Sequence, residues 1–264
     1  MTSIKNSTIL FDLNHNEMLN VHDQEYSGFL RLLERQGVNI KLNKSTPLER
    51  RTFQGVDILI IGNPIDDYFS NGEIMEIVNF VRNGGGLLVV SEYGSDYLQK
   101  TNLNDLSGKH FGIYFEKDLV KHSTKNNDNC SSLISIQDFP AHEITKRMRE
   151  LKIGGSCSLT FNKKSLPLVK TDDTAWTEVF RDSSKGWIKN EENKPLTLVA
   201  GTEYGKGKVI ASGDVDLFSN NPAMGLNTLD NRRFVLSLLN WLIEPIEGDR
   251  VTAWALDQLG VLQN

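Results

Sequence analysis

Carboxylates follow two apolar runs of this sequence, and they are the side chains best placed to do chemistry. Glu92 lies two residues beyond the run 87–90, and Asp214 and Asp216 come just after the run 208–212. In an open α/β sheet, the side chains beyond the carboxyl ends of the strands form the ligand-binding edge. Two carboxylates at that edge could act as acid and base, or they could bind a cation or sugar hydroxyls.

Each of these carboxylates also has a structural interpretation. Glu92 could cap the helix that follows it, where its charge complements the helix dipole, and this is the interpretation that we favour. Asp214 could accept hydrogen bonds from backbone amides of the loop 219–222. Asp214 and Asp216 share a face only if the strand continues through Val215, because side chains alternate along a strand.

A histidine follows the first apolar run, in the polar loop 12–17. We expect this loop to open on the same edge as Glu92. His15 and His22 could join Glu17 around a metal ion, but their spacing matches no known ligand set. We therefore predict a hydrogen-bonded loop histidine, and we predict neither a metal nor a cofactor.

We expect the polar residues beyond adjacent strands to line one concavity at the carboxyl edge of the sheet. The candidate ligand-binding residues are Asp12, His15, Asn63, Glu92, Tyr93, Asp214 and Asp216. None of them is assigned a catalytic role.

The periodicity of apolar residues predicts the elements that position this edge. Apolar runs at 8–11, 38–42, 57–62 and 87–90 predict strands, and 3.6-residue spacing predicts helices at 26–36 and 74–81. This order is typical of a doubly wound, mainly parallel α/β layer. A hairpin turn at 205–207 and a closing helix at 231–242 complete it.

The middle and the end of the chain follow other patterns. Short apolar runs at 133–136, 158–161, 166–169 and 176–180 predict antiparallel strands added to, or inserted in, the parallel sheet. We expect one α/β domain over 1–264, with 122–195 as a β-rich embellishment. Apolar residues at helical spacing predict a short helical tail over 249–264; we expect it to dock on the domain, and pairing with another subunit is the alternative.

The composition excludes several classes of function. With 39% hydrophobic and 24% charged residues, the chain has the composition of a soluble globular protein. A net charge of −5 argues against nucleic-acid binding, and no segment is apolar enough to span a bilayer or to act as a signal peptide. Cys130 and Cys157 lack the spacing of a zinc site or disulfide scaffold. We therefore expect a cytoplasmic protein, and the sequence leaves its oligomeric state open.

Four segments resemble those of the class I glutamine-amidotransferase-like superfamily. The closer resemblance is to its non-catalytic branch, which includes the GIFT domain of intraflagellar transport proteins and related uncharacterised prokaryotic domains. It extends over about residues 8–243 and implies a flavodoxin-like, three-layer fold. The segments are Ile-Leu-Phe-Asp-Leu-Asn-His at 9–15, Gly-Gly-Leu-Leu-Val-Val at 85–90, Phe-Gly-Ile-Tyr-Phe at 111–115 and the glycine-bearing stretch 205–214.

The resemblance also implies where catalytic groups would lie. Active members carry a cysteine in the turn after the strand at 87–90, where this chain has Ser91, Glu92 and Tyr93. They carry a His-x-Glu pair after the last strand, where this chain has the acidic segment 214–216. Ser91 lacks the flanking glycines of a nucleophile elbow.

Two functions remain after this comparison. The first is a non-enzymatic binding or scaffold module, with a protein partner or a small polar ligand. The alternative is a divergent hydrolase or carbohydrate-active protein that uses Glu92 and Asp214. Loss of the cysteine and the histidine favours the first.

Overall fold

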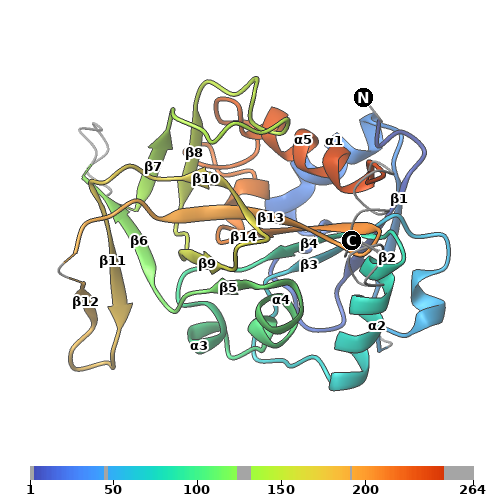
Figure 1. Ribbon diagram of the computed structural model, residues 1–264, viewed down its shortest axis with the longest axis horizontal. Coiled ribbons are helices and arrows are strands. Elements are labelled where there is room, and N and C mark those ends of the chain that lie inside the picture. Colours follow the sequence, from blue (N-terminus) through green and yellow to red (C-terminus); the bar gives the residue numbers. More distant parts are fainter. Residues whose placement is uncertain (1–2, 45–46, 124–131, 191, 247–264) are drawn as a thin grey trace, which may run out of the picture.

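The computed structural model describes residues 3–44, 47–123, 132–190 and 192–246, and its centre is a nine-stranded sheet (Figure 1). The chain has an α/β fold, as the sequence predicts. The predicted tail over 249–264 and Cys130 lie outside the described residues.

Five parallel strands form one half of this sheet. They lie in the order β2-β1-β3-β4-β14. From β1 the chain proceeds first to β2 on one side and then to β3 on the other, so the direction of winding reverses between β1 and β3. Such a reversal leaves a crevice at the carboxyl ends of the two strands. The strands are β1 (Thr8–Asp12), β2 (Asn39–Asn43), β3 (Ile58–Gly62), β4 (Gly86–Val90) and β14 (Gly207–Ser212).

Antiparallel strands form the other half. The predicted hairpin at 205–207 is confirmed, because β13 pairs with β14 in antiparallel fashion. Both β9 and β10 pair with β13, and β5 pairs with β9. The strands are β5 (Ile113–Phe115), β9 (Leu159–Phe161), β10 (Leu166–Lys170) and β13 (Thr197–Tyr204).

Two smaller sheets stand apart from the main one. All four short runs of the middle segment are antiparallel strands, as predicted. Those at 158–161 and 166–169 join the main sheet, whereas those at 133–136 and 176–180 form separate sheets instead of joining it. β11 (Ala175–Phe180) pairs with β6 (Leu119–His122) and β12 (Trp187–Lys189), and Figure 1 shows β11 and β12 extending away from the main sheet. β7 (Leu133–Ile136) pairs with β8 (Leu151–Gly154). Pairing partners depend on the path of the intervening chain, which the apolar runs do not encode.

Helices cover both faces of the main sheet (Figure 1). Strand residues alternate between the faces: Ile9 and Phe11 belong to the core with α1 and α5, whereas Leu10 belongs to the core with α2 and α4. No helix of the described ranges is long and apolar enough to cross a membrane. The helices are α1 (Ser27–Arg35), α2 (Asn71–Arg82), α3 (Ser95–Gln99), α4 (Leu103–Phe111) and α5 (Asn231–Ile243), with 3-10 turns at Gln24–Tyr26, Arg50–Phe53 and Asp216–Phe218.

Candidate functional site

The carboxyl edge of the parallel strands holds two groups of buried polar side chains. The first, which we call the His15 cluster, lies beyond β1 and β3 and contains Asp12, His15, Glu17, Asn43 and Glu73. The second, which we call the Glu92 cluster, lies beyond β4 and β14 and contains Glu92, Asp214 and Asp216. The predicted site residues therefore share one edge of the sheet and divide into two groups.

The loop after β1 carries the His15 cluster to the end of β3. Asn16 adopts a left-handed backbone with φ +55°, which asparagine tolerates, and so turns the chain back. Glu17 then forms an antiparallel bridge with Pro64, and the Met18 amide donates to the carbonyl of Asn63 at 3.0 Å. This pairing fixes the loop at the point where the winding of the sheet reverses.

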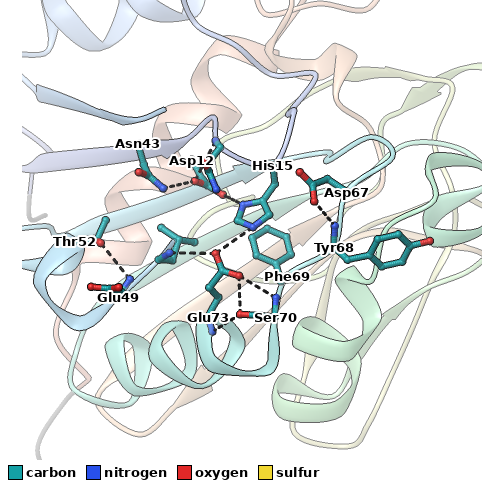
Figure 2. A network of polar contacts seen from close by, with 12 residues as sticks. Asp12, His15, Asn43, Glu49, Thr52, Asp67, Tyr68, Phe69, Ser70 and Glu73 are labelled. Atoms are coloured by element: carbon teal, nitrogen blue, oxygen red, sulfur yellow. Dashed lines mark hydrogen bonds and ion pairs between the residues drawn. The ribbon is translucent and has the colours of Figure 1, made fainter. Parts of the chain in front are cut away.

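His15 is held between two carboxylates (Figure 2). Its Nδ1 lies 2.6 Å from Oδ2 of Asp12, and its Nε2 lies 3.2 Å from Oε1 of Glu73 on α2. The ring of Phe69 packs against the imidazole, with 4.0 Å between the ring centroids. Only 3% of His15 is exposed. The prediction of a hydrogen-bonded loop histidine is confirmed.

Both carboxylates that flank His15 are fixed by other groups. Asn43 at the end of β2 donates from Nδ2 to Oδ1 of Asp12 at 2.8 Å. Glu73 forms the capping box of α2 with Ser70, whose backbone amide and hydroxyl both donate to Oε2 of Glu73, at 2.9 and 2.8 Å. The amide of Leu48 donates to the other oxygen of Glu73. The orientation of His15 is therefore set on two sides.

Glu17 completes the cluster and is less well satisfied. Its Oε2 accepts a hydrogen bond from the His15 amide at 3.2 Å. Its Oε1 lies 3.9 Å from Nδ1 of His15 and has no hydrogen-bond partner, although the side chain is wholly buried. Burial and the charge of Asp12 raise the pKa of Glu17 to about 10.

The charge state of His15 follows from the same contacts. Burial disfavours the imidazolium, but the hydrogen bond to Asp12 and the charges of Asp12, Glu73 and Asp67 outweigh it, so the pKa of His15 is raised. One histidine thus faces three carboxyl groups in a site that water hardly reaches.

Glu92 in the second cluster bonds to backbone. Its Oε1 accepts from the Tyr93 amide at 3.3 Å, and its Oε2 accepts from the Val215 amide at 3.4 Å. The expected helix cap is wrong: Gly94 is the N-cap of α3, and no side chain caps that helix. The turn bends Glu92 toward the loop after β14 instead. Burial, followed by the charge of Asp214, raises the pKa of Glu92 well above its usual range.

Asp214 also bonds to backbone amides, but not to those that we expected. Its Oδ2 accepts from Gly154 at 3.2 Å and its Oδ1 accepts from Asp216 at 2.8 Å, so it joins β8 to the loop after β14 rather than bonding to the loop 219–222. Burial and the charge of Asp216 raise the pKa of Asp214 well above its usual range. Asp216 is less buried and bonds to Ser219.

The other predicted site residues lie around these clusters. Asn63 is fully buried at the end of β3, its amide donates to the carbonyl of Val90, and its Oδ1 has no hydrogen-bond partner. Tyr93 is 39% exposed and its ring meets Trp187 of β12 at 5.8 Å. Ligand binding by the predicted residues stays a prediction.

Sequence reasoning missed Glu73 and Asn43. The Ser70-x-x-Glu73 spacing is a visible capping box and could have located the start of α2. The contact between Glu73 and His15 could not be found from this spacing, because it depends on how α2 packs against the sheet. Asn43 carried no local signal.

The chain belongs to the family described as domain of unknown function DUF4350, whose model matches residues 25–239. A search of curated proteins finds no match. Among solved structures, the mmIFT52 N-terminal domain is similar, with a TM-score of 0.73 and 18% identity over 89% of this chain and 97% of that one.

Two bacterial structures are also similar in fold. Cytoplasmic protein STM1381 from Salmonella typhimurium has a TM-score of 0.53 and 15% identity over 89% of this chain and 96% of its own. A ThuA-like protein from Bacteroides uniformis has a TM-score of 0.52 and 12% identity over 91% of this chain and 92% of its own. At these identities the likeness concerns the fold alone.

Proposed function

We propose that this member of the DUF4350 family is a non-enzymatic, amidotransferase-like binding or scaffold module. The observation that carries the proposal is the turn after β4, where no nucleophile lies beside a base. Ser91 occupies the turn, and its hydroxyl is buried without a hydrogen-bond partner. An activated serine needs a base within hydrogen-bond reach.

The described cysteine gives no alternative nucleophile. Cys157 is fully buried, and burial, followed by the charges of Asp118 and Glu92, raises the pKa of its thiol well above the usual range. The thiolate is the nucleophilic form, and reactive cysteines lie in electropositive, partly exposed surroundings. Cys157 is instead fully buried and lies near the negative charges of Asp118 and Glu92.

A group of contacting aromatic side chains supports a protein partner over a small ligand; Tyr93 is exposed, and Trp187 and Phe180 are partly exposed. Tyr93, at the turn after β4, contacts Trp187 of β12, and Trp187 contacts Phe180 of β11 at 5.7 Å between ring centroids. These residues belong to or border the small sheet that extends away from the main one (Figure 1). Exposed aromatic residues are enriched in protein interfaces.

The raised pKa values of Glu92 and Asp214 favour the alternative, a hydrolase that uses two carboxylates, because a general acid must hold a proton at neutral pH. Their surroundings weigh against it. Asp214 is fully buried and Glu92 nearly so, and each carboxylate accepts hydrogen bonds from two backbone amides. A substrate could reach neither without breaking the loops that they join.

The proposal is tested by assaying the purified chain for glutamine, amide and glycoside hydrolysis, beside Cys157→Ala and Asp214→Asn. We expect no turnover above that of a buffer blank. Turnover that Cys157→Ala abolishes would establish a thiol mechanism, and turnover that Asp214→Asn abolishes would establish the carboxylate hydrolase. Either result would overturn the proposal.

The partner surface is tested by photo-cross-linking in the native host, with a photoreactive amino acid in place of Tyr93. Tyr114 on β5 is the control position, because it is similarly exposed at 43%. We expect a discrete cross-linked protein at position 93 that disappears when Trp187→Ala is added. Equal cross-linking at both positions would contradict this surface.

A further inference from the structure

We propose that Asp12, His15 and Glu17 bind one divalent transition-metal ion, such as Zn²⁺ or Mn²⁺, at the carboxyl edge between β1 and β3. This site goes beyond the proposed function and does not depend on it, because a metal ion at this position is compatible with a binding module or an enzyme. From the sequence, we considered His15 and Glu17 with His22 and predicted no metal; the proposed site has Asp12 as the third ligand instead of His22.

The three side chains present their ligand atoms to one point. One nitrogen of His15 and one oxygen each of Asp12 and Glu17 all lie within 4.8 Å of one another. Bonds of about 2.0–2.1 Å place the ligand atoms of a zinc site roughly 3–3.5 Å apart. On metal binding, the contact of 2.6 Å between Nδ1 of His15 and Asp12 would widen and that of 3.9 Å between Nδ1 and Glu17 would shorten.

The unpartnered oxygen of Glu17 is an independent observation that points to a ligand. Oε1 has no hydrogen-bond partner, belongs to a side chain with no exposed area, and is directed toward Nδ1 of His15. A buried oxygen without a partner costs stability, so such groups are rarely left unpaired. A cation between Asp12, His15 and Glu17 would satisfy it.

Glu73 and Asn43 occupy the positions of residues that orient metal ligands. A metal-binding histidine usually donates its other ring N–H to a carboxylate, which fixes the tautomer. Glu73 lies 3.2 Å from Nε2 of His15, so Nε2–H can donate to it while the lone pair of Nδ1 faces the ion. Asn43 holds Asp12 in the same manner, through the oxygen turned away from His15.

The charge of the site also fits a divalent cation. Within the described part of the chain, the ion pairs formed by Asp12, Glu17 and Glu73 are all with His15. Three buried carboxyl groups therefore share a single histidine. Buried charges are paired or coordinate metals.

The ligand types select the metal. Calcium and magnesium prefer sites made of oxygen alone, whereas imidazole suits zinc, and the two carboxylates also suit manganese. One imidazole with two carboxylates leaves a further coordination position for water or a partner's side chain, as in open metal sites.

Metal binding to the untagged full chain tests the site. The protein is treated with chelator, then incubated for hours with Zn²⁺, Mn²⁺ or Mg²⁺, because buried ligands are expected to load slowly. After desalting, the metal content is measured by mass spectrometry and the affinity by competition with a chelating dye. We expect about one Zn²⁺ or Mn²⁺ per chain, a higher Tm, and little Mg²⁺.

Glu17→Gln and Glu73→Gln separate this site from adventitious binding. We expect Glu17→Gln to lower the affinity more than a hundredfold and Glu73→Gln to lower it about 10–100-fold, as loss of a residue that orients a ligand does. Asp172→Asn, which alters the surface pair of Asp172 with His122, is the matched control and should change nothing. Equal loading of the wild type and Glu17→Gln, or no loading of the folded wild type, would overturn the proposal.

A measurement on the wild type keeps the test decisive if Glu17→Gln does not fold. Electron spin-echo spectroscopy of the Mn²⁺-loaded wild type detects a nitrogen ligand directly. We expect coupling to a single imidazole nitrogen, and its absence would overturn the proposed ligand set.

Discussion

The His15 cluster and the Glu92 cluster lie at the same edge of one sheet and use their carboxylates differently. In the Glu92 cluster, Glu92 and Asp214 accept hydrogen bonds from backbone amides of neighbouring loops. In the His15 cluster, Asp12 and Glu73 also accept hydrogen bonds from backbone amides, but in addition they face the two ring nitrogens of one histidine.

The difference teaches which buried carboxylates are structural. An amide N–H is a fixed donor, so a carboxylate bonded to several of them stabilises the loops and has little capacity left for a ligand. A carboxyl oxygen that faces only another acceptor or a titratable nitrogen can still bind a ligand. Glu17 is such a residue, because its Oε1 has no hydrogen-bond partner.

The largest expected effect is that of Asp12→Ala. This change removes a hydrogen-bond partner of His15 and one of Asn43 in a buried place, and we expect the free energy of unfolding to fall by about 3–5 kcal/mol. Urea denaturation measures it. Asp172→Ala removes a similar partner from His122 at a position that is 61% exposed, so its cost should be about 0–1 kcal/mol. Equal costs would show that burial does not distinguish these pairs.

Gly155→Ala should have the next largest effect and tests how tightly the Glu92 cluster is packed. Gly155 has φ +69°, and an added Cβ would lie 2.7 Å from Oε1 of Glu92. We expect a loss of about 3 kcal/mol by chemical denaturation, from backbone strain and displacement of Glu92. Gly186→Ala is the control, because Gly186 has φ +62° and nothing within 4 Å of the added Cβ, so only about 1–2 kcal/mol of strain applies. A loss no greater than that of the control would mean that Glu92 moves freely.

Glu92→Gln should change the pH dependence of stability. The folded-state pKa of Glu92 is raised, so its proton is bound more tightly in the folded protein. The resulting stability is fully present below the ordinary carboxyl pKa and is lost as the pH rises through the raised folded value. In the wild type, ionisation of Glu92 should make the free energy of unfolding fall as the pH rises above about 5. In Glu92→Gln this fall should be less steep, by up to about 1.4 kcal/mol per pH unit.

Denaturation at several pH values measures this slope. Glu34→Gln, at an exposed position on α1, is the control and should keep the wild-type slope. An unchanged slope in Glu92→Gln would mean that burial of Glu92 does not alter its protonation.

Tyr93→Ala should have the smallest effect on stability. Its ring is 39% exposed and makes one edge contact with Trp187, so we expect a loss of at most about 0.5–1 kcal/mol. A loss above about 2 kcal/mol in urea denaturation would show that Tyr93 supports the fold, and would weaken its proposed role at a partner surface.

The apolar runs predicted the parallel half of the sheet closely. The runs at 8–11, 57–62 and 87–90 correspond to β1, β3 and β4, because a strand covered on both faces must be almost wholly apolar. A helix was expected after Glu92, without bounds, and corresponds to α3, whereas α4 was not predicted. Gly108, Asn104 and Ser107 lower the helix propensity of α4, and packing of Leu103 and Leu106 into the core compensates for it.

By itself, the sequence determined that polar residues lie beyond the parallel strands, because hydrophobic periodicity fixes where each strand ends. Only the tertiary structure decided their roles. It placed Glu73 of α2 against His15 and Gly155 beside Glu92, through contacts between segments far apart in the chain. A carboxylate's protonation and partners depend on the groups within a few ångströms of it, and folding alone brings those groups together.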